Sequence, residues 1–185
     1  FFMATWAFAV SFNQGPLYMK ILLAFIVVMT IGTLTANAQV AIKKDVIKTS
    51  AGDLELMFIG HASLLMTFQG QIIHFDPYGK VADYPKLPKA DLVFITHDHN
   101  DHFDLKALES IQKKDTVVIL PPICSEKVPE GWIMENGESL TVKGIAIQAI
   151  PAFNIVHKRA NGQFFHPKGL GNGDVLTMGD TRIYV

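Results

Sequence analysis

The sequence predicts an α/β fold in which β-sheets are stacked and helices lie on the outside. Many short segments of residues 39–185 are apolar or alternate between apolar and polar side chains, as β-strands do. Few segments have the spacing of an amphipathic helix, and glycine or proline separates most of them. With 185 residues, 49% hydrophobic and 18% charged, the chain is large and apolar enough to form a globular core.

Most of the expected elements are strands. Strands are predicted at residues 54–59, 63–68, 71–75, 91–95, 116–120, 139–142 and 144–150, and a C-terminal hairpin at 174–178 and 181–185. The first three form an antiparallel meander, because Gln69-Gly70 suits a tight turn. Asp104 is suited to cap a helix over 105–113, and residues 151–172 are expected to form a loop.

Residues 1–38 differ from the rest, since Lys20 is their only charged side chain. Residues 19–38 read as a signal peptide: a methionine, a lysine, an apolar run and Ala-Asn-Ala before the expected cleavage site. An uncleaved anchor is the alternative, but the apolar run is short for the ~20 residues of a membrane span. We therefore expect an exported protein, periplasmic or secreted, without stable membrane association, whose domain is 39–185. Residues 1–18 are expected to be a spurious upstream extension.

Charge and cysteine content exclude several classes of partner and site. The formal net charge is −1 and no long basic run occurs, which argues against nucleic-acid binding and favours a small-molecule substrate. The single cysteine, Cys124, excludes an intrachain disulfide and a multi-thiolate zinc site, and we expect a buried, inert thiol. The oligomeric state is not predicted.

Three of the seven histidines lie in Thr-His-Asp-His-Asn-Asp-His, directly after the buried strand at 91–95. His97 and His99 are two residues apart, so in extended backbone their side chains point to the same side. Asp101 and His102 provide a second pair of donors. Imidazole and carboxylate are the ligands of catalytic zinc, although manganese or iron accepts the same set. The alternative is a solvated, histidine-rich turn.

The segment Thr96–His102 resembles the His-x-His-x-Asp-His signature of the metallo-β-lactamase superfamily. Gly60–Ser63 and Phe75–Pro77 resemble the branch that includes ascorbate-6-phosphate lactonase-like hydrolases. The likeness extends from about Leu54 to Val185. It implies an αββα sandwich with one or two metal ions at one edge of the sheets.

The resemblance also implies roles for individual residues. His97 and His99 would bind the first ion, and Asp101 and His102 the second. Asp76 would hold the metal loop in place, as a carboxylate that orients metal-bound imidazoles does, or would simply belong to a turn before proline. His61 would face the substrate, or merely end a strand.

The third ligand of the first ion is not settled by the motif. The family has a histidine about fifty residues further on, where this sequence has Asn154. His166, in a proline-containing loop, is the preferred candidate, and His157 is the other. Lys168 is a candidate for contact with an anionic substrate, with a solvated lysine as the alternative.

Gly179-Asp180-Thr181 has the letters of the family's metal-bridging segment, but it lies between two apolar runs, where a hairpin turn is expected. We therefore expect the bridging aspartate to follow Val185. On this interpretation the chain is truncated at its C-terminus and holds the N-terminal half of the sandwich and part of its second sheet.

These observations predict a metal-dependent hydrolase in which a metal-bound hydroxide attacks an ester, lactone or phosphodiester. A bound metal lowers the pKa of water from 15.7 to about 7, and Asp101 is placed to accept a proton from the attacking water. The alternative is an exported metal-binding protein, or a member of the same fold without activity, which Asn154 in a ligand position would favour.

Overall fold

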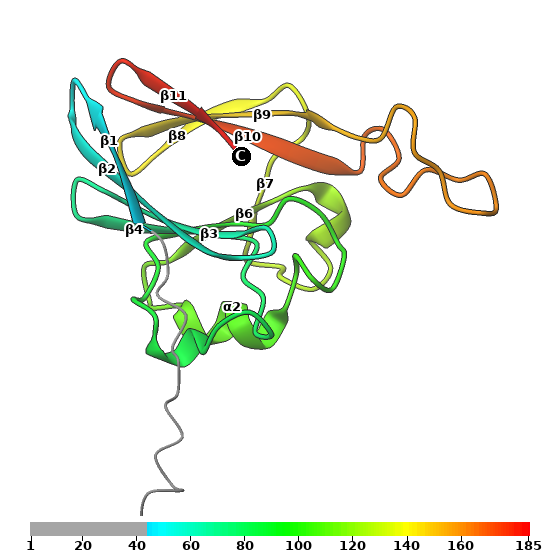
Figure 1. Cartoon of the computed structure of the whole chain (residues 1–185), viewed down its shortest axis with the longest axis horizontal. Helices are drawn as coiled ribbons and strands as arrows, with labels where there is room; N and C mark the ends of the chain where they lie inside the picture. The colour runs from blue at the N-terminus through cyan, green and yellow to red at the C-terminus, as the bar shows by residue number, and fades with distance from the viewer. Residues whose placement is uncertain (1–43) are drawn as a thin grey trace, which may run out of the picture. The chain divides into compact units, whose positions relative to one another are not determined.

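The computed structural model describes residues 44–185, which form two facing β-sheets (Figure 1). The seven-stranded sheet has the order β1-β2-β3-β4-β5-β6-β7, and the four-stranded sheet the order β11-β10-β9-β8. The strands are β1 (Lys44–Thr49), β2 (Gly52–Gly60), β3 (Ser63–Phe68), β4 (Gln71–Phe75), β5 (Leu92–Phe94), β6 (Val117–Leu120), β7 (Trp132–Ile133), β8 (Ser139–Val142), β9 (Ile145–Ala152), β10 (Gly171–Met178) and β11 (Thr181–Tyr184). The prediction of stacked sheets is confirmed.

The larger sheet changes from antiparallel to parallel pairing half-way across. Strands β1 to β4 pair antiparallel, whereas β4, β5, β6 and β7 pair parallel. In parallel pairs the carboxyl ends of the strands meet at one edge of the sheet, which is where ligands bind in many α/β proteins. The histidine-rich segment leaves β5 at this edge.

The predicted helix is confirmed as α2 (Leu105–Ile111), which ends two residues before the predicted boundary. The Asp104 side chain accepts hydrogen bonds from the backbone N–H of Lys106 and of Ala107, at 3.1 and 3.3 Å. These bonds satisfy donors that the first turn of a helix leaves free. The helix packs on the face of the larger sheet that points away from the smaller one (Figure 1). The other helical segments are the 3-10 turns η1 (Tyr84–Lys86) and η2 (Pro122–Cys124).

Apolar side chains of both sheets form the core between them. It includes Leu54, Met66, Phe75 and Phe94 from the larger sheet and Ile147, Leu176 and Met178 from the smaller. The rings of Phe75 and Phe94 stack with centroids 4.7 Å apart. These two residues end the strands that lead to the site, so the core fixes the directions in which both strands emerge.

Strand β10 begins at Gly171, three residues before the predicted start, and the connection 153–170 extends away from the sheets (Figure 1). The sequence Gly-Asn-Gly has little intrinsic preference for a strand. It is extended here because it pairs with the end of β9, and the Asn172 N–H donates to the Thr96 carbonyl oxygen at 2.9 Å. A Cβ on Gly171 would lie 3.3 Å from that same oxygen. The glycine lets β10 approach the histidine-rich segment closely.

Gly179 and Asp180 form the turn between β10 and β11, as predicted. Gly179 has φ 64°, a conformation that glycine adopts readily. The Asp180 carboxylate accepts a hydrogen bond from the Ser50 N–H at 2.8 Å, and the Asp180 N–H donates to the Ser50 hydroxyl at 2.9 Å. Its contacts thus join two turns of the protein.

Replacing Asp180 with alanine is therefore expected to leave metal content and activity unchanged, because its hydrogen bonds serve the turn at Ser50. Elemental analysis of the purified variant and a hydrolysis assay check this expectation. Loss of metal in the variant would show instead that Asp180 is a ligand.

Two further sequence predictions meet different outcomes. Cys124 is buried, as predicted, and burial, with Asp98 nearby, raises the pKa of its thiol to about 12; its inertness stays a prediction. No helix within residues 44–185 is long and apolar enough to cross a membrane. The predicted signal peptide at 19–38 lies outside the described residues.

Candidate metal centre

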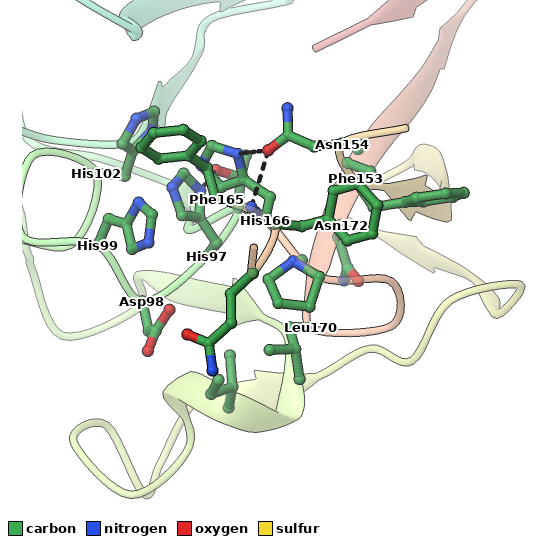
Figure 2. Close-up of a pocket in the computed structure, with 18 of the residues that line it drawn as sticks. His97, Asp98, His99, His102, Phe153, Asn154, Phe165, His166, Leu170 and Asn172 are labelled. Carbon is green, nitrogen blue, oxygen red and sulfur yellow. Dashed lines mark hydrogen bonds between the residues drawn. The ribbon is translucent and has the colours of Figure 1, made fainter. Parts of the chain in front are cut away.

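Three histidines from two distant segments meet at the edge of the sheets. His97 and His99 follow β5, and His166 comes from the connection between β9 and β10 (Figure 2). One ligand atom of each lies within 4.8 Å of those of the others. The His166 ring is 4.8 Å from that of His97 and 4.9 Å from that of His99, centroid to centroid. His157, the other candidate, is exposed and belongs to none of the groups of metal-binding side chains in residues 44–185.

Asn154 holds His166 in this position. Its side-chain oxygen accepts hydrogen bonds from the His166 N–H and from Nδ1 of the ring, both at 2.8 Å (Figure 2). The Asn154 N–H in turn donates to the His166 carbonyl oxygen at 2.9 Å. Asn154, which the resemblance placed at a ligand position, therefore orients a histidine twelve residues further on.

A second group consists of His61, Asp101 and His102, whose ligand atoms also lie within 4.8 Å of one another. His61 Nε2 is 2.9 Å from Asp101 Oδ2. His61 reaches this position through a sharp turn after β2, in which Gly60 has φ 144° and His61 itself φ 52°. Such a φ is unusual for a residue other than glycine and is found where the surrounding structure requires it.

Asp76 directly follows β4 and contacts the histidine-rich segment 96–102. Its side chain is almost fully buried. Oδ1 accepts a hydrogen bond from the Thr96 N–H at 2.8 Å. Oδ2 accepts one from the Thr96 hydroxyl and one from His102 Nδ1, both at 2.7 Å. Asp76 thus makes the contacts expected of a residue that holds the loop in place. Thr96 was not predicted as part of the site.

The comparison with known proteins identifies the family. Residues 55–184 match the family described as beta-lactamase superfamily domain. The chain belongs to the metallo-β-lactamase superfamily. Over 141 residues it is 26% identical to a UPF0173 metal-dependent hydrolase of Nanoarchaeum equitans, covering 71% of this chain and 62% of that protein.

Solved structures agree with this assignment. A crystal structure described as a metal-dependent hydrolase of Parabacteroides distasonis is 36% identical, with a TM-score of 0.73, covering 78% of this chain and 65% of that chain. A metallo hydrolase of Ignicoccus hospitalis shares the fold at 23% identity and a TM-score of 0.54, covering 71% of this chain and 59% of that chain. This chain thus spans about two thirds or less of the relatives' lengths.

Hydrogen bonds fix the tautomers of three imidazoles in this superfamily site. The Thr96 hydroxyl gives its only hydrogen to Asp76, so at 2.9 Å it must accept one from Nδ1 of His97. Nδ1 of His102 donates to Asp76, and Nδ1 of His166 donates to Asn154. In each neutral ring Nε2 then carries the free lone pair, which is the arrangement that suits a metal ligand.

The electrostatic environment keeps two of these rings neutral. Burial, together with His102, His99 and His166 nearby, lowers the pKa of His97 to about 3. Burial, together with His99, His102 and Arg159 nearby, lowers the pKa of His166. For His102, burial lowers the pKa, but the hydrogen bond to Asp76 and its charge outweigh this effect and raise it. Cationic imidazoles crowded this closely repel one another, and an ion would bind to their neutral forms.

One atom bears on whether the site suits a metal ion. His97 Nε2 is buried and has no hydrogen-bond partner. A buried polar atom without a partner costs free energy, of the order of 1–3 kcal/mol. Coordination of an ion between His97, His99 and His166 would satisfy this nitrogen, so the superfamily's ion fits the residues present.

Two candidates from the sequence lie around this centre. His61 contacts Asp101, as described above, and its ring lies 5.2 Å from that of His102. The Lys168 ammonium lies 5.6 Å from the centre of the Phe153 ring. Lys168 is therefore close to the cavity described below, to which Phe153 contributes, while its proposed contact with a substrate stays a prediction.

Replacing Asp76 with asparagine is expected to lower metal affinity about 10- to 100-fold. The amide can accept a hydrogen bond at only one atom, so it loses either the Thr96 N–H or the pair formed by the Thr96 hydroxyl and His102. Competition with a fluorescent chelator measures the change. Asp91→Asn is the matched control, since this carboxylate pairs with Lys113 away from the site; equal affinities in wild type and Asp76→Asn would contradict the assigned role.

Proposed function

We propose that the protein is a metal-dependent hydrolase whose side chains would bind two neighbouring metal ions. His97, His99 and His166 would hold the first ion, and Asp101 and His102 the second, with His61 close to both of these ligands. The observation that carries the proposal is the meeting of three imidazoles, two of them anchored through Nδ1, around a buried nitrogen without a partner. Zinc is the metal that this ligand set favours.

A bound ion in such a site activates water and stabilises the negative charge that develops on the substrate. The chain's own residues orient the centre. Asp76 fixes His102 directly and His97 through Thr96, and Asn154 fixes His166. Correct orientation of ligands before the reaction lowers its barrier, because the residues need not rearrange.

Asp101 is the proposed proton acceptor for the attacking water. Burial raises its pKa, but a hydrogen bond to its own backbone N–H, the charge of His102 and the contact with His61 outweigh burial and lower the pKa. The carboxylate is therefore ionised at neutral pH. Oδ2 of the ionised carboxylate accepts a hydrogen bond from His61 Nε2 at 2.9 Å, and this contact orients Asp101 for its role.

The proposed substrates are esters, lactones or phosphodiesters, and the lactonase-like branch of the superfamily is our preferred placement. In an ester, water's oxygen forms a bond to the acyl carbon, the C–O bond breaks, and the alcohol leaves with a proton. The test compares full-length protein loaded with zinc, loaded with manganese and stripped by chelator on all three classes. Metal-dependent turnover of one class supports the proposal; a protein that holds metal and hydrolyses none contradicts it.

We also propose that the protein acts outside the cytoplasm. The support is the pattern of residues 19–38, with a lysine, an apolar run and Ala-Asn-Ala. Mass spectrometry of the mature N-terminus tests this. A chain that starts at Gln39 supports cleavage, whereas a chain that retains the apolar run argues against it.

A further inference from the structure

A cavity of about 560 Å³ opens beside the first group of histidines (Figure 2). This volume is in the range of pockets that enclose small organic ligands. His97, His99 and His166 line one part of it. The rest of its wall is largely apolar and includes Ile123, Phe153, Phe165, Pro167 and Leu170. A substrate that reaches the ions from this cavity must place its remaining atoms against these side chains.

Much of this apolar wall is exposed to solvent. Ile123, Phe153 and Leu170 retain 38%, 37% and 42% of their accessible surface. Burying apolar surface of this kind contributes about 25 cal/mol per Å². The wall therefore favours an apolar group next to the reacting bond over a fully polar substrate such as a free sugar.

One cation faces this cavity. Arg159 lines it, and its guanidinium lies over the Phe165 ring, 4.6 Å from the ring centre. Stacking on an aromatic ring holds the guanidinium plane while leaving its N–H groups available. Among the ion pairs in residues 44–185, none joins Arg159 to a carboxylate. Its charge is therefore available to a ligand.

The backbone also holds Arg159 in place. Its N–H donates to the Gln163 carbonyl oxygen at 2.7 Å, and its own carbonyl oxygen accepts from the Gly162 N–H at 2.9 Å. An antiparallel bridge pairs Lys158 with Phe164 next to this turn. The arginine is thus carried on a small closed hairpin within the connection 153–170.

We propose that the substrate is an amphiphilic anion. Its apolar chain or ring lies against Ile123 and Leu170, and an oxyanion remote from the reacting bond pairs with Arg159. Guanidinium binds carboxylate and phosphate through two parallel hydrogen bonds, so either group meets this requirement. The inference rests on the proposed hydrolase function and adds the class of substrate.

The test uses metal-loaded, full-length protein and two matched esters, p-nitrophenyl hexanoate and the mono-p-nitrophenyl ester of adipic acid. They differ at the far end of the chain, where a methyl group replaces a carboxylate. We expect kcat/KM to be about ten-fold higher for the adipate ester, because its far carboxylate forms a charge-assisted hydrogen bond with Arg159 and the methyl group cannot. Arg159→Gln should bring the two values together, and Arg159→Lys should keep part of the difference.

Arg182→Gln is the matched control, because Arg182 belongs to β11 and contacts Gln148 rather than the cavity. It should keep the wild-type preference. Leu170→Asn should lower the preference for p-nitrophenyl hexanoate over the acetate. Comparing inhibition by hexanoate, a carboxylate, with inhibition by hexyl phosphate shows which of these two oxyanions the cavity binds more tightly.

The outcomes distinguish the two proposals. Turnover without preference for the adipate ester, or a preference that Arg159→Gln leaves intact, overturns the inference while the hydrolase function stands. Absence of turnover of any ester, lactone or phosphodiester overturns the function itself. Should Arg159→Gln fail to fold, the salt dependence of the wild-type preference decides, since pairing with Arg159 must weaken as salt increases.

Discussion

Replacing His97 with alanine is expected to remove metal from the site and abolish measurable hydrolysis. A ligand atom of His97 lies within 4.8 Å of those of His99 and His166, and His97 forms a second such group with Asp76 and His102. A metal ion stabilises a transition state by several kcal/mol, and each 1.36 kcal/mol is tenfold, so we expect kcat/KM to fall by about 10³-fold or more. Elemental analysis and the hydrolysis assay measure the two effects on one preparation.

His157→Ala is the matched control, because His157 is an exposed histidine of the same connection that carries His166. It should retain full metal content and activity. Circular dichroism should show both variants folded, since alanine at position 97 removes a partly buried ring without touching the core between the sheets. If His97→Ala kept its metal and its activity, the first group of histidines would not be the metal centre.

Asp174→Asn is expected to stabilise the protein at neutral and alkaline pH. Asp174 lies on β10 with 1% of its surface exposed, and its Oδ1 has no hydrogen-bond partner. Burial, and to a smaller extent the charge of Asp76, raises the pKa of this carboxyl from 3.8 to about 7. Three pKa units correspond to about 4 kcal/mol, and the new amide leaves its own N–H groups unpaired, so a gain of about 2 kcal/mol is expected.

The sign of the pH dependence follows from proton binding. Between pH 4 and pH 7 the unfolded chain has lost the Asp174 proton and the folded protein retains it, so the free energy of unfolding falls as pH rises. Asparagine removes this dependence. Urea denaturation should therefore show the variant more stable than wild type by about 2 kcal/mol at pH 8, and less stable at pH 4, where Asp174 is protonated and only the cost of the unpaired amide remains. A variant that is less stable than wild type at pH 8 would show that the native carboxylate has a favourable partner.

Local patterns were sufficient to predict the framework of the site. The buried strand before Thr96 and the alternation of His97 and His99 describe one short segment, in which neighbours in sequence are neighbours in space. The meander before Asp76, the cap at Asp104 and the hairpin turn at Gly179 are local in the same sense. Each depends on side-chain periodicity or turn chemistry, which the sequence states directly.

Contacts between distant segments were beyond such patterns. Which of Asn154, His157 and His166 lies beside His97 and His99 depends on how the connection 153–170 folds back, and hydrogen bonds within that connection place His166 there. Thr96 reads as an ordinary residue at a strand end until its partners Asp76 and His97 are known.

Strand β1 (Lys44–Thr49) was not predicted for a related reason. Its residues alternate between exposed and half-buried, and its pairing with β2 at the edge of the sheet forms it. Arg159 was not singled out either, because nothing in a charged turn of the sequence indicates that its guanidinium faces a cavity.

The most direct test of the account is the metal content of the purified, full-length protein. We predict that plasma emission spectroscopy finds between one and two equivalents of a transition metal, and that His166→Ala and His99→Ala each lose most of one equivalent. A full-length protein that contains no transition metal, and takes up neither zinc, manganese nor iron when these are supplied, would contradict the account.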